Sequence, residues 1–410
     1  MRVVGLDVSH TIIEVVYLEE GRIRSGGRVP VTREALQTFA KRLQADDHVV
    51  LEATGNTAAI VAALTPQVGR VVVANPLLVR LIAEAKVKTD RIDAAVLAQP
   101  YGSGFLPEVW TPDDSTQALR RQVARRSQIV RQRVRLKNEI HSVLATHLLG
   151  KSPAADLFGK KGRAWLGEQP LPLDERLGVE QRLRELDRLT EDQVAIERLL
   201  GEAVLADPRV HRLLTITGIN TAVAIGILAA IGDIGRFASA EKLVSYFGLN
   251  PTVHQSGLQP PIHGKISKRG RSHARAMLVE AAWAAAKAPG PLRAFFLRIR
   301  QRRGEQIAAV ATARKLAVIV WNVLHDDEDF AWNRPALTAM KRRRLELQAG
   351  LPARKGSRKG IAAEYSLKHI RDRERAMAQQ AERGYARMVA HWQTQPKVKG
   401  TGAAKPTRNP

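Results

Sequence analysis

The chain has 410 residues, enough for two or more domains with their own hydrophobic cores. Its 65 Lys and Arg exceed its 40 Asp and Glu and give a net charge of +25, which favours a polyanionic partner, nucleic acid first, because basic side chains release counterions from phosphates. It has no cysteine, which excludes disulfides and thiolate metal sites, and its most apolar uncharged run, residues 221–232, is too short to span a bilayer, so we expect a soluble, cytoplasmic protein without a signal peptide.

The first predicted element is an apolar run, residues 3–9, that carries a single acid, Asp7. A second strand-like run, residues 11–18, follows almost at once, so the pair is predicted to form a tight hairpin in a sheet. A carboxylate at the end of a buried strand is costly unless it has a use. We therefore treat Asp7 as a candidate functional residue.

Alternating strand and helix signals continue to about residue 105 and predict an α/β layer. A second acid, Glu52, stands where a buried strand is stopped by a glycine. The predicted strands cover residues 22–29, 48–55 and 70–74, and the predicted helices cover residues 32–43, 58–64 and 77–85.

Two further acids, Asp90 and Asp93, open a short predicted helix that ends near residue 97. Their spacing of three places them on one helix face. Taken singly, Asp7 and Glu52 could be strand ends at a turn or in solvent, and Asp90 with Asp93 could be a helix cap and a first-turn acid. Together, they are the acids with which a ribonuclease-H-like fold holds two Mg²⁺ (or Mn²⁺) ions, because hard cations prefer carboxylate oxygens and two of them can flank a scissile phosphate.

From residue 111 to about 149 the pattern is wholly helical, with apolar positions on one face and many arginines on the others. Arg121 and Arg125 are candidate nucleic-acid contacts on this helix, although the charges could serve solubility alone. Gly and Pro predict a linker at 150–172, and a second long helix is predicted at 174–206. Two such helices, packed antiparallel, would make a stalk between domains.

A second domain is predicted to begin near residue 209, where residues 213–224 have the form of a helix-hairpin-helix. Gly218 would take a positive φ at the turn, and Asn220 would tolerate one. Backbone amides at such a turn can bind phosphate without reading sequence. An ordinary helical hairpin is the alternative.

Ser256 lies in a predicted loop, residues 252–257, after a predicted helix at 237–247. A serine facing many cations could act as a nucleophile, because positive charge stabilises its alkoxide and a phosphorane. Alternatively, Ser256-Gly257 is simply a turn. The candidate nucleic-acid-binding cations that follow are Lys265, Lys268, Arg269, Arg271 and Arg275.

Three apolar helices, at 272–287, 292–302 and 306–324, are predicted to close the second core, with Trp283, Phe295, Phe296 and Trp321 as packing centres. Beyond them, residues 331–410 hold 19 Lys and Arg against 5 Asp and Glu. Clusters at 341–344, 354–355 and 358–359 suit contact with a nucleic-acid backbone. A helix at 362–389 is possible, and the end of the chain is predicted to be disordered.

These motifs, in this order, resemble the DEDD transposases of insertion sequences, the IS-one-ten and IS-eleven-eleven group, and the resemblance runs from residue 1 to about 325. After Ser256-Gly257 the chain departs from it with a stiff Pro260-Pro261 segment, and the basic tail lies outside it. The carriers are residues 5–9 (GLDVS), 51–55 (LEATG), 88–94 (KTDRIDA), 217–219 (TGI), 247–251 (FGLNP), 256–257 (SG) and 268–270 (KRG).

The resemblance implies a ribonuclease-H-like, RuvC-type domain joined by a coiled coil to a helical transposase domain. It implies that Asp7, Glu52, Asp90 and Asp93 bind Mg²⁺ (or Mn²⁺) and that Ser256 attacks DNA, leaving a phosphoserine link and a free 3′ hydroxyl. It also implies a noncoding guide RNA, the bridge RNA, and a dimer or tetramer as partners. The expected domains are 1–105 (RuvC-type), 106–208 (stalk), 209–328 (transposase, with the helix-hairpin-helix and serine loop) and 329–410 (basic extension).

Three other functions are weighed against this one. A Holliday-junction nuclease would use the acids for hydrolysis and leave Ser256 structural. An actin-like sugar kinase or ATPase would need glycine-rich phosphate loops, which Ser9-His10-Thr11 does not offer. A noncatalytic coating protein would have no use for four converging acids.

Overall fold

The computed structural model describes residues 2–82, 90–257, 259–353 and 367–394. The chain divides into two compact units, residues 1–113 and 114–410, and each is described by itself. The first unit is a mixed α/β sheet, and the second is almost wholly helical. This combination agrees with the predicted fold class at the level of α/β plus all-α.

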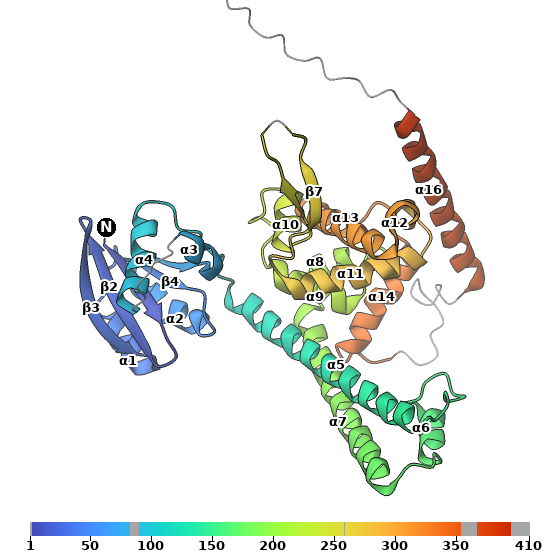
Figure 1. The fold of residues 1–410 in the computed structure, drawn as a ribbon. Helices are drawn as coiled ribbons and strands as arrows, with labels where there is room; N and C mark the ends of the chain where they lie inside the picture. The colour runs from blue at the N-terminus through green and yellow to red at the C-terminus, as the bar shows by residue number, and fades with distance from the viewer. Residues whose placement is uncertain (1, 83–89, 258, 354–366, 395–410) are drawn as a thin grey trace, which may run out of the picture. The chain divides into compact units, whose positions relative to one another are not determined.

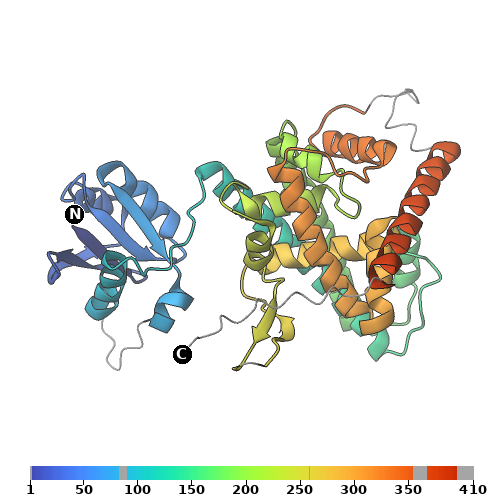
Figure 2. The ribbon, with the colours of Figure 1, turned by 90° about the horizontal axis from the view of Figure 1, so that it is seen from above.

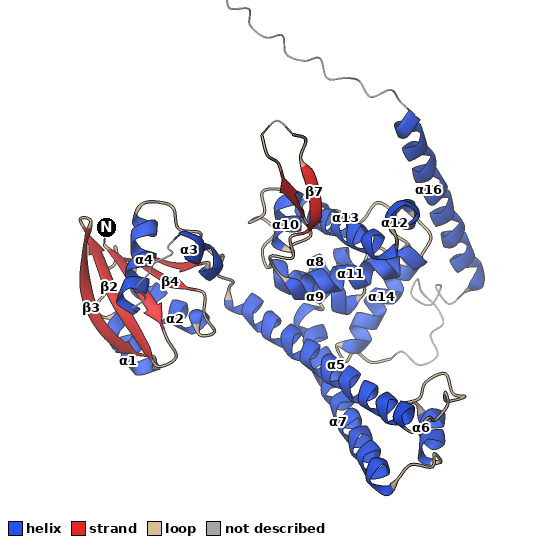
Figure 3. Cartoon of the chain, viewed as in Figure 1, coloured by secondary structure: helices blue, strands red, loops and turns tan. Residues whose placement is uncertain are grey.

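The sheet of the first unit has five strands in the order β3-β2-β1-β4-β5 (Figures 1 and 3). Strands β1, β2 and β3 are antiparallel neighbours, whereas β1, β4 and β5 run parallel. The central strand of the sheet is β1, which is also the first strand in the sequence. The strands are β1 Val3–Val8, β2 Ile12–Glu19, β3 Arg22–Pro30, β4 His48–Glu52 and β5 Arg70–Ala74.

Helices cover both faces of this sheet (Figure 2). One face packs against α1 and α2 through side chains such as Phe39 and Ile60, and the other against α3 and α4 through Val79 and Leu97. The end of the predicted helix 77–85 lies outside the described residues. The helices are α1 Arg33–Ala40, α2 Thr57–Leu64 with a following 3-10 turn η1 Thr65–Gln67, α3 Pro76–Ile82 and α4 Asp90–Gly102.

The second unit starts with two long helices, α5 Asp114–Thr146 and α7 Leu173–Val204, close to the predicted 111–149 and 174–206. They pack antiparallel, since Arg126 pairs with Glu197 at 2.6 Å near one end and Glu139 pairs with Arg182 at 3.0 Å nearer the other. Apolar side chains, including Ile129 and Leu186, fill the seam.

The linker predicted at 150–172 is wrong, because this stretch contains helix α6 Lys160–Gly167 and a core of its own. Leu157 and Leu166 pack there against Ile140 of α5. Gly162 is required by this packing, since a Cβ on it would lie 2.3 Å from the carbonyl oxygen of Asp156. Gly162, one of the glycines that suggested a loop, is therefore needed for close packing of α6 against residue Asp156.

The main core of the second unit surrounds helix α9, of which nearly every residue is buried. The predicted helix 272–287 is confirmed to the residue by α11, and Phe296, one of the predicted packing centres, meets Trp283 edge to face. Helix α13 is long and apolar enough to cross a membrane, but about half of it is buried in this core. The helices are α8 Pro208–Leu213, α9 Thr221–Ile231, α10 Ala240–Tyr246, α11 Ser272–Lys287, α12 Pro291–Arg303 and α13 Glu305–His325.

The cluster at 341–344 is folded into this unit and is not a free basic tail. It lies on a helix that the sequence reading missed, α14 Pro335–Gln348, whose Leu345 is fully buried. Lys341 Nζ donates to the carbonyl oxygens of Leu214 and Ile216 at 2.7 and 3.1 Å. For Lys341 the predicted nucleic-acid contact is wrong, because its charge caps the turn after α8.

The other two basic clusters, at 354–355 and 358–359, and the end of the chain after residue 394 lie outside the described residues. The helix predicted at 362–389 corresponds to α16 Lys368–Thr394. It packs along α12 within the second unit (Figure 1).

Lys341 gives the protein a pH-dependent stability. Burial lowers its pKa from 10.5 to about 8, and nearby Arg334 acts in the same direction. Between these two pH values the unfolded chain holds a proton that the folded chain has released, so the free energy of unfolding rises with pH across this window. We expect this rise, measured by thermal unfolding from pH 8 to 10, to be smaller in Lys341→Met. Equal pH dependence in both proteins would contradict the assignment.

Candidate functional site

Asp7 and Glu52 lie side by side on one face of the sheet, at the carboxyl ends of two parallel strands. The register pairs Gly5 with Val50 and Leu6 with Leu51, which carries on to Asp7 and Glu52. Because side chains alternate across a strand, both acids share the face of Val50. That face is the one covered by α3 and α4. Both carboxylates are partly buried and both make contacts.

Helix α4 comes unusually close to this face at Gly5. A Cβ on Gly5 would stand 2.3 Å from the carbonyl oxygen of Ala94, so only glycine fits. At the other end of the helix, Tyr101 Oη lies 2.7 Å from Nδ1 of His48, the first residue of β4. The helix therefore runs antiparallel to β1 and β4. Its first turn, which begins with Asp90 and includes Asp93, lies at the edge of the sheet where the two strand acids are.

A third strand acid, Glu14, belongs to the same face and was missed by sequence reasoning. It stands directly opposite Asp7 in the antiparallel register of β1 and β2, so the two side chains project to the same side. Glu14 is 8% exposed and accepts a 2.9 Å hydrogen bond from Arg28 Nε on β3. This ion pair already neutralises Glu14. Residues 11–18 (TIIEVVYL) do not alternate strictly between apolar and polar, so their pattern does not show which face Glu14 takes.

The four acids are thus brought together only in part by what the structure describes. Asp7 and Glu52 share a face, and Asp93 is partly buried in the first turn of α4. The side chain of Asp90 lies outside the described residues. Among the side chains that are described, no three His, Asp or Glu residues gather closely enough to hold a metal ion. The four-acid metal site stays a prediction.

The Gly5 contact can be tested by adding one methyl group. Gly5→Ala forces the strand and α4 apart, and we expect it to cost about 1–3 kcal/mol of unfolding free energy and to weaken DNA cleavage. Gly55→Ala is the matched control, since a Cβ there meets nothing within 4 Å. Urea unfolding of the three proteins gives the comparison. A Gly5→Ala protein as stable as Gly55→Ala would refute the close approach.

Ser256 lies in the loop of a two-stranded ribbon, β6 Pro251–His254 and β7 Ile262–Ile266, that extends from the helical unit (Figure 3). The prediction of a plain loop at 252–257 was therefore wrong for its first residues. Ser256 is exposed, its carbonyl oxygen accepts from the amide of Gln259 at 3.3 Å, and Gly257 has a φ of +55°. The hydroxyl is accessible to a large substrate.

The base of this ribbon is held by two glycines and two of the predicted cations. A Cβ on Gly270 would lie 2.2 Å from the carbonyl oxygen of Tyr246, and Gly248 has a φ of +67°. Arg275 donates to the carbonyl oxygens of Phe247 and Lys268. Arg271 donates to the Tyr246 hydroxyl at 2.8 Å. Arg271 and Arg275 thus fix the ribbon, whatever else they bind.

The pKa of the Tyr246 hydroxyl reflects the positive charge around the base of the ribbon. Burial alone would raise its pKa, but the positive charge of Arg271, together with that of Arg236 and Arg120, outweighs burial and lowers it. Three other predicted cations, Lys265, Lys268 and Arg269, are exposed on the ribbon or the turn that follows it. The surroundings of the ribbon base are strongly positive, as a phosphate-binding surface requires.

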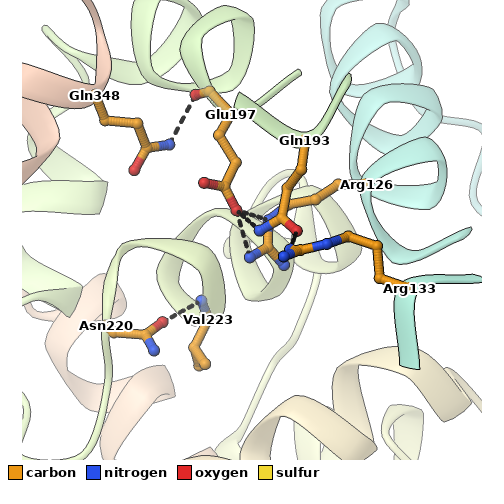
Figure 4. A network of polar contacts seen from close by, with 7 residues as sticks. All are labelled: Arg126, Arg133, Gln193, Glu197, Asn220, Val223 and Gln348. Carbon is orange, nitrogen blue, oxygen red and sulfur yellow. Dashed lines mark hydrogen bonds and ion pairs between the residues drawn. The ribbon is translucent and has the colours of Figure 1, made fainter. Parts of the chain in front are cut away.

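The turn between α8 and α9 has the positive φ that was predicted for its glycine. Gly218 has a φ of +93°, and a Cβ on it would lie 2.3 Å from the carbonyl oxygen of Ala281 on α11. Asn220 does not adopt a positive φ. It is extended and caps α9, its side-chain oxygen accepting from the amide of Val223 at 2.9 Å (Figure 4). Asn220 is exposed, and phosphate binding by this turn stays a prediction.

Several arginines of α5 are paired with α7. Glu197 accepts from Arg126 and Gln193, and Gln193 accepts in turn from Arg133 (Figure 4). Arg125 pairs with Asp192 at 3.7 Å. Arg121 is exposed. The basic faces of α5 are therefore partly neutralised by the acids of its partner helix, and nucleic-acid contacts by Arg121 and Arg125 stay predictions.

Comparison with known proteins gives this geometry its context. Residues 4–148 match the family described as Transposase, the DEDD type of IS110, and residues 210–297 match the family described as Transposase IS116/IS110/IS902 family. A probable family 20 transposase of Pseudomonas aeruginosa is 31% identical, over 60% of this chain and 77% of that protein. The chain belongs to the IS116/IS110/IS902 family of transposases.

Two further relatives of this transposase are the transposase for insertion sequence element IS1111A of Coxiella burnetii and the pilin gene-inverting protein of Moraxella bovis. The first is 27% identical over 59% of this chain and 68% of that protein, and the second is 26% identical over 69% and 81%. The predicted resemblance is confirmed. The enzyme is a transposase that cuts and rejoins DNA, and its two matched regions contain the predicted acids and the predicted serine.

Proposed function

We propose that this transposase moves an insertion sequence through a covalent phosphoserine intermediate, with a metal-binding acidic site in its first unit and Ser256 in its second. The observation that carries the proposal is the parallel register of β1 and β4, which pairs Leu6 with Leu51. Asp7 and Glu52 are the next residue of each strand, so they share one face of the sheet. Exposure of Ser256 in the loop of a ribbon supports the second half. The strand order β3-β2-β1-β4-β5, with one antiparallel edge, supports a ribonuclease-H-like, RuvC-type assignment.

The residues present fit a hard divalent cation. Carboxylate oxygens from rigid elements are the donors that Mg²⁺ prefers, and two of these acids stand on neighbouring strands. Asp7, Glu52, Asp90 and Asp93 would hold Mg²⁺ (or Mn²⁺). When bound, the ion would neutralise charge on a scissile phosphate.

In the proposed step, Ser256 Oγ attacks the phosphorus atom of a DNA phosphodiester. A new bond joins Oγ to phosphorus, the bond to the 3′ oxygen breaks, and that oxygen leaves with a proton as a free 3′ hydroxyl. The serine proton passes to a neighbouring base or water. Cations such as Lys265 and Lys268 stabilise the added negative charge. The phosphoserine bond retains the free energy of the phosphodiester bond that was broken. The reverse step can therefore join a new pair of strands without ATP.

The acids and the serine belong to different compact units, 1–113 and 114–410. The proposed site is therefore composite, and its halves come from one chain or from two subunits of a dimer or tetramer. We further propose a noncoding bridge RNA as a partner, in keeping with the net charge of +25. DNA flanking the gene tests this point, since it should contain a noncoding segment complementary to the element ends and to the insertion site.

A Holliday-junction nuclease is the second candidate. Its specific support is that Gly257 has a φ of +55° and lies in a turn, a structural role that Ser256-Gly257 can fill without any chemistry. In that case the acids alone would hydrolyse DNA.

Substitution of the serine separates the two candidates. We expect the wild-type protein, incubated with DNA carrying both element ends, to form a protein–DNA adduct that survives denaturation. Ser256→Ala should lose the adduct and slow strand cleavage on the order of 10³-fold or more, because the nucleophile is gone. Ser245→Ala, an exposed serine of α10, is the control. Clean hydrolysis products that persist in Ser256→Ala would support the nuclease.

The acidic site has a readout that does not depend on activity. Mg²⁺ at one hundred times its dissociation constant should add about 2.7 kcal/mol to the unfolding free energy of wild type. Asp7→Asn should lose most of that gain and slow cleavage on the order of 10²-fold. Glu34→Gln, an exposed acid of α1, should keep both. If Mg²⁺ stabilises Asp7→Asn and wild type equally, Asp7 is not a ligand.

A further inference from the structure

Helix α16 lies outside both matched family regions and docks through its acids. Glu374 Oε1 accepts from the amide of Ala336 at 2.8 Å, in the first turn of α14. Glu382 Oε2 accepts from the amide of Gly290 at 3.0 Å, at the start of α12. Each carboxylate thus satisfies a free amide at the positive end of another helix. The two acids fix α16 to two elements at once.

Each of these carboxylates also meets an arginine. Glu374 lies 3.4 Å from Arg334, and Glu382 lies 3.1 Å from Arg293. The two acids are eight residues apart, which puts them on one side of the helix and about 12 Å apart along it. Val389, 6% exposed, is also buried. Because the attachment is made at several points, the opposite side of α16 is held in a fixed orientation.

The opposite side is strongly basic. In the described part of the chain, none of the Lys or Arg side chains of α16 forms an ion pair, and the only exposed acid on the helix is Asp372. Small residues, Ala376 and Ala386, lie beside Arg383 and Arg387 around a shallow depression. At about 100° per residue, Arg373, Arg383 and Arg387 lie on the side opposite the two docking acids. The other exposed cations of the helix, which lie nearer the docked side, are Lys368, Arg371 and Arg375.

The separation of acids and cations on α16 favours an anionic partner. Acids scattered among the cations would neutralise them, as Asp192 and Glu197 do for the arginines of α5. On α16, two of the three acids face inward at helix ends and leave the cations uncompensated. Guanidinium groups bind phosphate oxygens in pairs, and alanines allow a backbone to approach closely. Alternatively, water alone solvates these cations, and their loss would then leave nucleic-acid binding unchanged.

We propose that the exposed basic face of α16 binds the phosphodiester backbone of the nucleic acid on which the transposase acts, without reading its sequence. This inference rests on the proposed function for the presence of nucleic acid, and it adds a contact outside the matched regions. We take duplex DNA as the partner, because the chain belongs to a family of transposases, which act on DNA. Single-stranded RNA offers the same phosphate chemistry and is an alternative outcome of the test.

The test compares two pairs of arginines in the full-length protein. Arg383→Gln/Arg387→Gln removes two cations of the α16 face, and Arg184→Gln/Arg188→Gln removes two exposed cations with the same spacing on α7. Affinity for duplex DNA and for single-stranded RNA is measured from 50 to 200 mM salt. Each lost phosphate contact lowers the slope of log affinity against log salt by about 0.9 for duplex DNA and about 0.7 for a single strand.

We expect the α16 variant to lower the slope by about 1.8 on duplex DNA. A slope that falls only on single-stranded RNA, by about 1.4, would overturn duplex DNA as the partner of α16. The α7 variant should keep the wild-type slope on both. An unchanged slope in the α16 variant, or equal loss in both variants, overturns the proposal, because the effect would then be absent or a general one of charge.

Failure of this proposal differs from failure of the proposed function. Ser256→Ala should lose the covalent adduct yet keep the wild-type salt slope, because the serine adds no charge. If wild type forms the adduct but the α16 variant keeps its slope, only the α16 face is refuted. If wild type binds neither nucleic acid, both proposals are refuted. Unchanged thermal unfolding of the α16 variant confirms that its helix is still docked.

Discussion

The close approach of α4 to β1 is the constraint on which the proposed acidic site depends. With glycine at position 5, the carbonyl oxygen of Ala94 can lie directly over the strand, where a Cβ would be only 2.3 Å away. This contact fixes how far the first turn of α4 stands above the sheet. It lies two residues before Asp7 and one residue after Asp93, so it also sets the distance between a strand acid and a helix acid. Metal ligands must be held within fractions of an ångström, and a backbone contact is stiffer than one made by side chains.

Several of the basic side chains are used inside the second unit to bind the carboxyl end of helix α9. The last carbonyl groups of α9, residues 229–232, accept hydrogen bonds from Arg120, Arg209 and Arg236, which come from three different parts of the unit. Cations at the negative end of a helix are favourable, and here they also join α5 and α8 to α9. Together with Lys341, these residues show that the net charge overstates the surface available to nucleic acid. Many basic residues of this protein therefore build its fold.

The sequence predicted regular, apolar elements well and irregular ones poorly. Helix α11 begins and ends where its apolar spacing says, and β5 does as well. The ribbon around Ser256 was missed because its strands are short and its return contains Pro260 and Pro261, which weaken any strand pattern. Helix α14 was missed because its Lys341 and neighbouring arginines look solvated.

The candidate site shows the same division. Asp7 and Glu52 could be singled out from strand ends, since parallel register brings such ends together. Glu14 could not, because its face depends on a register that only the folded hairpin fixes. The docking of α16 was also beyond sequence reasoning, since nothing in the chain order joins Glu382 to the amide of Gly290, 92 positions away.

The ribbon that carries Ser256 has a consequence for how such enzymes diversify. Two strands alone are only marginally stable, and this pair is anchored at its base by Gly248, Gly270 and Arg275. Its far end contributes little to the folding of the helices beneath. Insertions or substitutions in this loop should therefore disturb the helices little, so that the sequence around the serine can vary while the scaffold stays the same.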